Sequence, residues 1–336
     1  MGALMVAVRI NPTALPSGPM LTIPELEAAA IRAAHATIPP AFRDTPQYVH
    51  EGLSARLGVA VIVKVETLNP IRSFKGRGTW VVVADLAAAG TIGPDRPIIC
   101  ASAGNFGQGV AWAARALGIP TVVFASRNAN PGKVARMRAL GAEVIQVGND
   151  FDDARAAAES AAGDGRGHLL VDGEEPRIST GAATLALEIS DGVLAGALPS
   201  PAEISVPVGN GALIIGIGSW LQAELPGCRI VGVQAEGAAA MTLSWRVGRP
   251  IDTDSATTYA DGIASRVAIP AAVALMAGRV DEMRTVSDAD LRTAQAELTA
   301  ELGITVEGAA AASWAGLLAG PRPDGPAIVI VTGSNV

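Results

Sequence analysis

Short runs of β-branched and aliphatic residues alternate with alanine-rich stretches along most of the chain from about residue 96. The apolar runs predict strands because they are short and bounded by glycine, proline or polar residues. The alanine-rich stretches predict helices, and one of them ends at Gly141. The expected strands are 97–101, 121–125, 143–147, 168–171, 203–207, 229–234 and 327–331. The expected helices are 109–117, 133–140, 152–161, 182–189 and 213–223.

This alternation predicts an α/β fold with mostly parallel sheets that are covered by helices on both faces. A chain of 336 residues is long enough for two lobes with a cleft between them. Ligands in such folds bind beyond the carboxyl ends of the strands. The loops that follow the predicted strands, including 332–335 after the last one, are therefore the places to look for chemistry.

Composition and charge limit the function classes. The chain is 49% hydrophobic and 17% charged, which fits a packed enzyme. With a net charge of −7 and no dense lysine-arginine cluster, we expect no nucleic-acid partner. We expect no membrane span, and residues 1–9 lack the features of a signal peptide. Cys100 and Cys228 are too few for a disulfide framework and fit a reducing cytoplasm.

One lysine lies in an unusual sequence environment. Lys75 belongs to the segment 73–78 (SFKGRG), which we interpret as turn-like, glycine-punctuated and directly after a strand. Most lysines lie on solvated helix faces, whereas an aromatic neighbour and close backbone approach indicate a recessed amine. Such an amine can form a Schiff base, so Lys75 is a candidate for covalent catalysis. A buried ion-pair partner is the alternative.

Two glycine-containing loops each join a predicted strand to a predicted helix. The segment 102–109 (SAGNFGQG) places free backbone N–H groups at a helix N-terminus, where carboxylates bind well. A plain strand-to-helix turn is the alternative. The segment 207–213 (PVGNGAL) would present N–H donors to an anion such as phosphate. It is not the dinucleotide fingerprint, because Ile214 replaces the third glycine, and Gly132-Lys133-Val134 does not complete a P-loop.

The order of these features resembles that of the fold-type II pyridoxal-phosphate enzymes, and among them the threonine/serine dehydratase (ammonia-lyase) family. The resemblance runs from Thr45-Pro46 through both motifs to 331–335 (VTGSN), and 260–264 (ADGIA) and 306–310 (VEGAA) also look like dehydratase segments. It implies a two-lobed fold like that of the tryptophan synthase β subunit. The large cofactor-binding domain would comprise 1–75 and 175–336, and a small domain, 76–174, would close over the substrate.

The resemblance also implies a role for each matched residue. Lys75 would hold pyridoxal 5′-phosphate as a Schiff base and later move the Cα proton, and Phe74 would pack by the cofactor. Asn105 would bond the phenolic oxygen of the cofactor, and the Thr332 hydroxyl would meet its pyridine nitrogen. The phosphate would be held by Gly209, Asn210, Gly211, Ala212 and Leu213. The substrate carboxylate would be bound by Ser102, Ala103, Gly104 and Asn105.

Several positions depart from the family pattern. Serine racemases of this family have a serine as second base where this chain has Ala103, whose methyl group carries no proton, so elimination is favoured over racemisation. Asn210 and Ala212 replace glycines of the phosphate loop. Because alanine does not tolerate left-handed backbone angles, we expect the loop's backbone to differ locally.

A metal site is matched only in part. Divalent-metal members use a glutamate, a backbone carbonyl and an aspartate after the strand that contains Gln234. Glu236 and Ala240 fit this spacing, but Thr242 replaces the aspartate, so we expect at most a monovalent or weakly bound divalent cation. A solvated or locally paired Glu236 is the favoured alternative. The histidines are scattered and lack zinc-ligand spacing: His35, His50 and His168.

The expected function is that of a pyridoxal-phosphate-dependent lyase. It would act by α,β-elimination on a small β-hydroxy amino acid of the serine or threonine type and release a 2-oxo acid and ammonia. The alternatives are β-replacement or threonine-synthase-like chemistry, then a racemase or a cofactor-binding protein without catalysis. A homodimer is expected by analogy with the family. The motifs do not choose between substrates that differ by one methyl group, which shifts selectivity by only about 1–3 kcal/mol.

Overall fold

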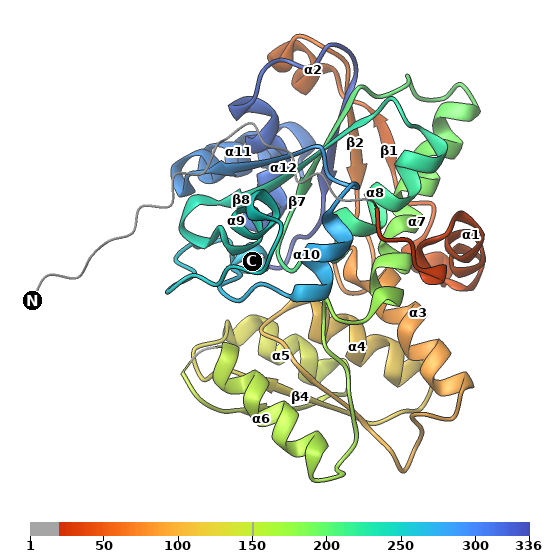
Figure 1. The fold of residues 1–336 in the computed structure, drawn as a ribbon, viewed down its shortest axis with the longest axis vertical. Coiled ribbons are helices and arrows are strands. Elements are labelled where there is room, and N and C mark those ends of the chain that lie inside the picture. Colours follow the sequence, from red (N-terminus) through yellow and green to blue (C-terminus); the bar gives the residue numbers. More distant parts are fainter. Residues whose placement is uncertain (1–19, 150) are drawn as a thin grey trace, which may run out of the picture.

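Two sheets organise the computed structural model, which describes residues 20–149 and 151–336 (Figure 1). The larger sheet has six strands in the order β1-β2-β10-β7-β8-β9, and β1 is its one antiparallel member. The smaller sheet has four parallel strands in the order β5-β4-β3-β6. The strands are β1 (Gln47–Val49), β2 (Val61–Val65), β3 (Ile98–Ala101), β4 (Thr121–Ala125), β5 (Glu143–Gln146), β6 (His168–Leu169), β7 (Glu203–Pro207), β8 (Arg229–Ala235), β9 (Glu282–Val286) and β10 (Ala327–Val331).

Helices cover both faces of each sheet. The α-helices are α1 (Ala28–Thr37), α2 (Glu51–Leu57), α3 (Lys75–Ala88), α4 (Asn105–Ala116), α5 (Pro131–Ala139), α6 (Phe151–Gly163), α7 (Pro176–Leu194), α8 (Ala212–Glu224), α9 (Ala240–Val247), α10 (Pro270–Met276), α11 (Asp288–Leu302) and α12 (Gly308–Ala319). Single 3-10 turns are η1 (Pro24–Leu26), η2 (Pro40–Phe42), η3 (Glu236–Ala238) and η4 (Asp261–Ile263). In Figure 1 the smaller sheet and helices α4, α5 and α6 form the lower part of the molecule.

The core follows from the alternation of side chains along the buried strands. On β10, Ile328 and Ile330 pack with α7, α8 and α10, whereas Ala327, Val329 and Val331 pack on the other face with α11 and α12. Because both faces are covered, the strand is apolar throughout. This explains why continuous apolar runs, and not alternating ones, mark the strands in the sequence.

The predicted strands and helices all occur, with small differences at their ends. Helix α4 begins at Asn105, four residues before its predicted start, and α7 spans Pro176–Leu194 instead of 182–189. The sequence predicted a strand before Lys75 without giving its bounds, and it predicted none of α1, α2, α3, α9, α10, α11, α12, β1 and β9. The mostly parallel α/β architecture is confirmed.

The local prediction around Lys75 was wrong. Strand β2 ends at Val65, and Lys75 is the first residue of α3, so Gly76 and Gly78 lie in a helix and not in a turn. Both glycines permit close packing. A Cβ atom on Gly76 would overlap the Phe42 ring, and one on Gly78 would overlap the backbone carbonyl oxygen of Ile178 at the start of α7.

None of the helices in the described ranges is both long and apolar enough to cross a membrane. The expectation for residues 1–9 concerns a segment outside those ranges. Cys100 and Cys228 are buried free thiols, and burial raises the pKa of each to about 12.

Candidate active site

Lys75 lies inside a cavity of about 630 Å³. The cavity is lined by the loops that follow β3, β6, β7 and β10, so it lies at the carboxyl ends of strands from both sheets. Of the chain's three lysines, Lys75 and Lys133 line this cavity, and Lys64 is buried elsewhere. The predicted site residues in its wall are Phe74, Lys75, Ser102, Ala103, Gly104, Asn105, Gly209, Asn210, Gly211, Leu213 and Thr332.

The Lys75 ammonium is paired with a carboxylate that sequence reasoning missed. Its Nζ lies 2.5 Å from Asp172 Oδ2, and the two side chains are only 13% and 19% exposed. Nζ also lies 5.3 Å from the centre of the Phe74 ring and 5.7 Å from that of Phe106. The second oxygen of Asp172, Oδ1, is buried and has no hydrogen-bond partner among the described residues. This leaves a buried acceptor in the cavity wall beside the amine.

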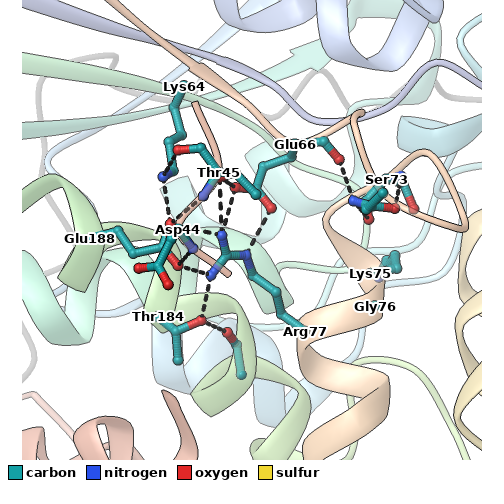
Figure 2. Close-up of polar contacts among 12 residues, drawn as sticks. Asp44, Thr45, Lys64, Glu66, Ser73, Lys75, Gly76, Arg77, Thr184 and Glu188 are labelled. Atoms are coloured by element: carbon teal, nitrogen blue, oxygen red, sulfur yellow. Dashed lines mark hydrogen bonds and ion pairs between the residues drawn. The ribbon is translucent and has the colours of Figure 1, made fainter. Parts of the chain in front are cut away.

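A buried ion network holds the start of α3 from the side away from Lys75 (Figure 2). Arg77 donates from Nε and Nη2 to Glu66, and from Nη1 and Nη2 to Glu188. Lys64 Nζ donates to Glu188 at 2.5 Å and to the carbonyl oxygen of Thr45. Two cations thus meet two carboxylates with almost no solvent exposure. The network fixes the backbone two residues after Lys75.

The shifted pKa values in this network follow from burial and charge. Burial alone would raise the pKa of Glu188, but its contacts with His35, Arg77 and Lys64 hold that pKa well below the usual range. Burial lowers the pKa of Lys64, although Glu66 and Glu188 oppose this effect. Glu188 therefore stays charged and holds Arg77 in place.

The segment 102–109, predicted to bind a carboxylate, joins β3 to the N-terminus of α4. Because α4 begins at Asn105, its first backbone N–H groups lack intrahelical partners and lie at the cavity. The Ser102 hydroxyl oxygen accepts hydrogen bonds from the N–H groups of Gly104 and Gly107, at 3.1 and 2.8 Å. The Ser102 side chain therefore shapes this loop.

The second loop leads into α8, which begins at Ala212. Its left-handed residue is Gly211, with φ of 99°, so the alanine at 212 is helical and unstrained. A Cβ atom on Gly209 would lie 2.8 Å from the carbonyl oxygen of Gly262. Ala212 is buried and does not line the cavity, and its N–H donates to Asn210 Oδ1 at 3.1 Å.

A buried glutamate, which the sequence did not single out as a site residue, orders Asn105. Asn105 Nδ2 donates to Glu307 Oε1 at 2.8 Å, and the backbone N–H of Asn335 donates to Glu307 Oε2 at 3.1 Å. The Asn335 side chain donates to Asn105 Oδ1. Burial raises the pKa of Glu307 to about 7, a shift that nearby Lys133 opposes and Asp261 reinforces. Asn105 is thus fixed in orientation and retains one amide hydrogen for a ligand.

The C-terminal motif is tied to the lysine segment. The backbone N–H of Phe74 donates to the carbonyl oxygen of Thr332 at 3.0 Å. Ser73 and Gly333 form an isolated antiparallel β-bridge. Thr332 thereby lies in the cavity wall next to Phe74 and Lys75. Four sequence motifs more than 20 residues apart, at 73–78, 102–109, 207–213 and 331–335, come together around one cavity.

The candidate cation ligands lie after β8. Glu236 is exposed in η3, and the carbonyl oxygen of Ala240 accepts from the Ser244 hydroxyl. The Thr242 hydroxyl donates to Gln234 Oε1 at 2.9 Å.

The donor set suits pyridoxal phosphate. A cavity lysine can bond an aldehyde, and the N-termini of α4 and α8 offer N–H donors to a carboxylate and a phosphate. The buried, unpaired oxygen of Asp172 offers a further polar contact.

Comparisons with known proteins point to the same cofactor. A family model described as pyridoxal-phosphate dependent enzyme matches residues 38–333. The L-threonine ammonia-lyase of Geobacter sulfurreducens is 33% identical over 286 residues, which are 84% of this chain and 69% of that protein. The biosynthetic L-threonine dehydratase IlvA of Mycobacterium leprae is 32% identical over 97% of this chain and 75% of its own length.

A solved structure shows the same architecture. The processed form of threonine deaminase isoform 2 from Solanum lycopersicum superposes with a TM-score of 0.82 at 26% identity, over 98% of this chain and 90% of that one. Sequence and fold relatives therefore point to one group of proteins. This chain belongs to the family of pyridoxal-phosphate-dependent enzymes and has their fold-type II architecture.

Proposed function

We propose that this chain is a lyase that eliminates water from a small β-hydroxy amino acid of the serine or threonine type and releases a 2-oxo acid and ammonia. The observation that carries the proposal is the position of Lys75 in a cavity bordered by the N-termini of α4 and α8. Relatives named L-threonine ammonia-lyase and L-threonine dehydratase support this substrate class.

Each wall of the cavity offers one part of the cofactor a partner. Lys75 would hold pyridoxal phosphate covalently, and Phe74 would pack beside it. Asn105 would bond the phenolic oxygen and Thr332 the pyridine nitrogen. The loop after β7 would hold the phosphate through Gly209, Asn210, Gly211, Ala212 and Leu213. The loop after β3 would bind the substrate carboxylate through Ser102, Ala103, Gly104 and Asn105.

The division of labour between cofactor and protein follows. When bound, the cofactor supplies an electron sink for the pair left when the Cα–H bond breaks. The Lys75 amine would take the Cα proton of the substrate. Ala103 carries no second proton acceptor, so a two-base racemisation is disfavoured. Phe74 and Phe106 border the amine and limit its contact with water.

The test begins with the attachment site. The holoprotein is reduced with borohydride and its peptides are mapped, and a chain with three lysines gives an unambiguous answer. We expect the label on Lys75 and not on Lys64 or Lys133. Lys75→Ala should lose both the visible imine absorption and the formation of 2-oxo acid from serine or threonine. Intact absorption and lyase activity in that variant would refute the proposal.

β-Replacement, including threonine-synthase-like chemistry, is the alternative within this family. The same enzyme would then transfer a nucleophile to Cβ in place of releasing the 2-oxo acid. Thiols and phosphorylated amino acids added to the purified holoprotein, with a search for substituted amino acids, distinguish the two reactions. Cofactor binding without turnover of any amino acid in a panel would indicate a non-catalytic protein.

Three further proposals concern the whole molecule. We propose that residues 76–174 form a small domain that closes over the substrate, against a large domain of 1–75 and 175–336. The four strands of the smaller sheet fall within 76–174 and the six strands of the larger sheet fall outside, which supports this division. We propose a homodimer by family analogy, testable by light scattering. The buried free thiols support a cytoplasmic location.

A cation near Glu236 and Ala240 is proposed on spacing alone, as monovalent or weakly bound divalent. The Ala240 carbonyl oxygen and the exposed Glu236 carboxylate would be its ligands. Calorimetric titration with Mg²⁺, Ca²⁺ and K⁺, compared with Glu236→Gln, tests it.

A further inference from the structure

Lys133 is a buried cation of the cavity that the proposed function leaves without a role. It lies in the first turn of α5, where Asn130 caps the helix, and its side chain is only 5% exposed. Its Nζ lies 2.5 Å from Asp261 Oδ2 in η4. The Asp261 side chain is 49% exposed. If the pair breaks, the Asp261 carboxylate can therefore be hydrated, whereas the Lys133 ammonium cannot.

The ammonium of Lys133 is beside the loop that would bind the substrate carboxylate. A Cβ atom placed on Gly104 would lie 3.2 Å from Lys133 Cδ and 3.7 Å from Nζ. The lysine stem thus packs against the backbone of Gly104, directly before the first N–H groups of α4. A carboxylate bound to those N–H groups would be close to the Lys133 ammonium.

The charges near Lys133 favour an exchange of anions. A buried ammonium requires an anionic partner, because desolvation without one is costly. Asp261 fills this need in the structure, and Glu307, whose pKa is raised, is the other carboxyl group that interacts with Lys133. An arriving carboxylate would keep Lys133 paired, and Asp261 would return to solvent at little cost because it is already half exposed.

We propose that Lys133 binds the α-carboxylate of the amino-acid substrate and that Asp261 is the internal anion which this carboxylate displaces. The inference deepens the proposed function and rests on it for the substrate class. It assigns Lys133 as a substrate-binding residue, and Asp261 as a residue that acts through Lys133 by competition.

The test compares a carboxylate with its amide. Binding of L-alanine, which has no β-leaving group, and of L-alaninamide is followed by the absorption change of the holoprotein. Lys133→Gln should raise the dissociation constant of alanine by about 10–100-fold, the effect of losing a hydrogen bond to a charged group, and should change that of alaninamide little. Arg155→Gln is the matched control, because Arg155 lines the cavity but already pairs with Glu159 and Glu174.

Asp261→Asn provides the second arm. If Asp261 competes for Lys133, its removal should lower the dissociation constant of alanine several-fold, and this gain should vanish in the Lys133→Gln background. Equal losses for alanine and alaninamide in Lys133→Gln would overturn the proposal, and so would weaker alanine binding in Asp261→Asn.

A calorimetric titration with propionate and propionamide repeats the comparison without a requirement for cofactor or turnover. If propionate binds more tightly than propionamide and this preference requires Lys133, the inference is supported. If the enzyme then shows no elimination activity, only the proposed reaction fails. Absence of any acid-over-amide preference overturns the inference while leaving the lyase reaction intact.

Discussion

Lys75 and Asp172 form an ion pair inside the cavity although 97 positions separate them in the chain. Lys75 begins α3, and Asp172 lies in the segment that leads from β6 to α7. The Asp172 carboxylate thus follows β6, a strand of the smaller sheet. The Lys75 amine belongs to α3, the helix that comes after β2 of the larger sheet. Asp172 is therefore the counter-charge of Lys75, the lysine proposed to hold the cofactor.

Replacement of Asp172 by asparagine keeps the size of the side chain and removes its charge. A carboxylate at hydrogen-bond distance favours the ammonium form of a lysine, whereas attack on an aldehyde requires the free amine. We expect Asp172→Asn apoprotein to take up pyridoxal phosphate several-fold faster than the wild type at neutral pH. Stopped-flow absorption measures both rates.

Glu174→Gln is the matched control for this experiment, because Glu174 lies on the same segment but pairs with Arg155. Its uptake rate should equal that of the wild type. Slower uptake in Asp172→Asn at every pH would contradict a counter-charge role and would indicate that the carboxylate supports the structure of the cavity.

The ion network around Arg77 predicts a large loss of stability. Arg77→Met leaves Glu66 and Glu188 buried with Lys64 as the remaining cation of the network. Removal of one partner from a buried ion pair costs about 3–5 kcal/mol. Arg56→Met is the control, because its pair with Glu297 is exposed and should contribute about 0–1 kcal/mol. Urea unfolding of both variants at 25 °C measures the difference, and similar losses in the two variants would rule out the proposed importance of burial.

Gly78 should not accept a side chain. Alanine is a better helix former than glycine by about 1 kcal/mol, so Gly78→Ala would stabilise an isolated helix. In the protein the new Cβ atom would overlap the carbonyl oxygen of Ile178, where α3 crosses α7. Because this contact is with backbone, we expect a net loss of about 1–3 kcal/mol in thermal or urea unfolding. The control is Gly163→Ala on α6, because the new Cβ atom meets open space there and should leave the free energy of unfolding unchanged or raise it. Gly90→Ala is not a suitable control, because φ is positive at Gly90.

Sequence reasoning found the parts of the site that are carried by local motifs. Lys75, Asn105, Gly209 and Thr332 each stand in a short segment next to a strand end or helix start, so each was found without knowledge of the fold. Asp172 has no such motif, and only the return of the chain from β6 to α7 places it beside Lys75. Chain topology, and not local pattern, determines this contact.

Contacts with distant segments also decide the roles of Lys133 and of Gly76 and Gly78 in α3. Lys133 stands in a segment that does not complete a P-loop, yet three lysines among 25 basic residues leave few candidates for a buried amine. The glycines of α3 were interpreted as turn residues because sequence alone does not distinguish a glycine needed for backbone angles from one needed for close helix contact. In each case the deciding neighbour lies on a distant segment.

The Glu307 carboxyl group predicts a pH dependence of stability. Burial raises its pKa from 4.5 to about 7, so the folded protein binds a proton that the unfolded chain releases in this range. The contribution to stability is complete below pH 4.5 and is lost as the pH rises through about 7, with an upper limit of about 3 kcal/mol.

Glu307→Gln cannot titrate, so the free energy of unfolding should fall more steeply between pH 5 and pH 8 in the wild type than in the variant. Because all other groups are common to both proteins, subtraction of the two urea-derived curves isolates Glu307. A difference that stays constant across this range would show that the carboxyl group is already charged at pH 5, and that Asn105 and the Asn335 backbone outweigh its burial.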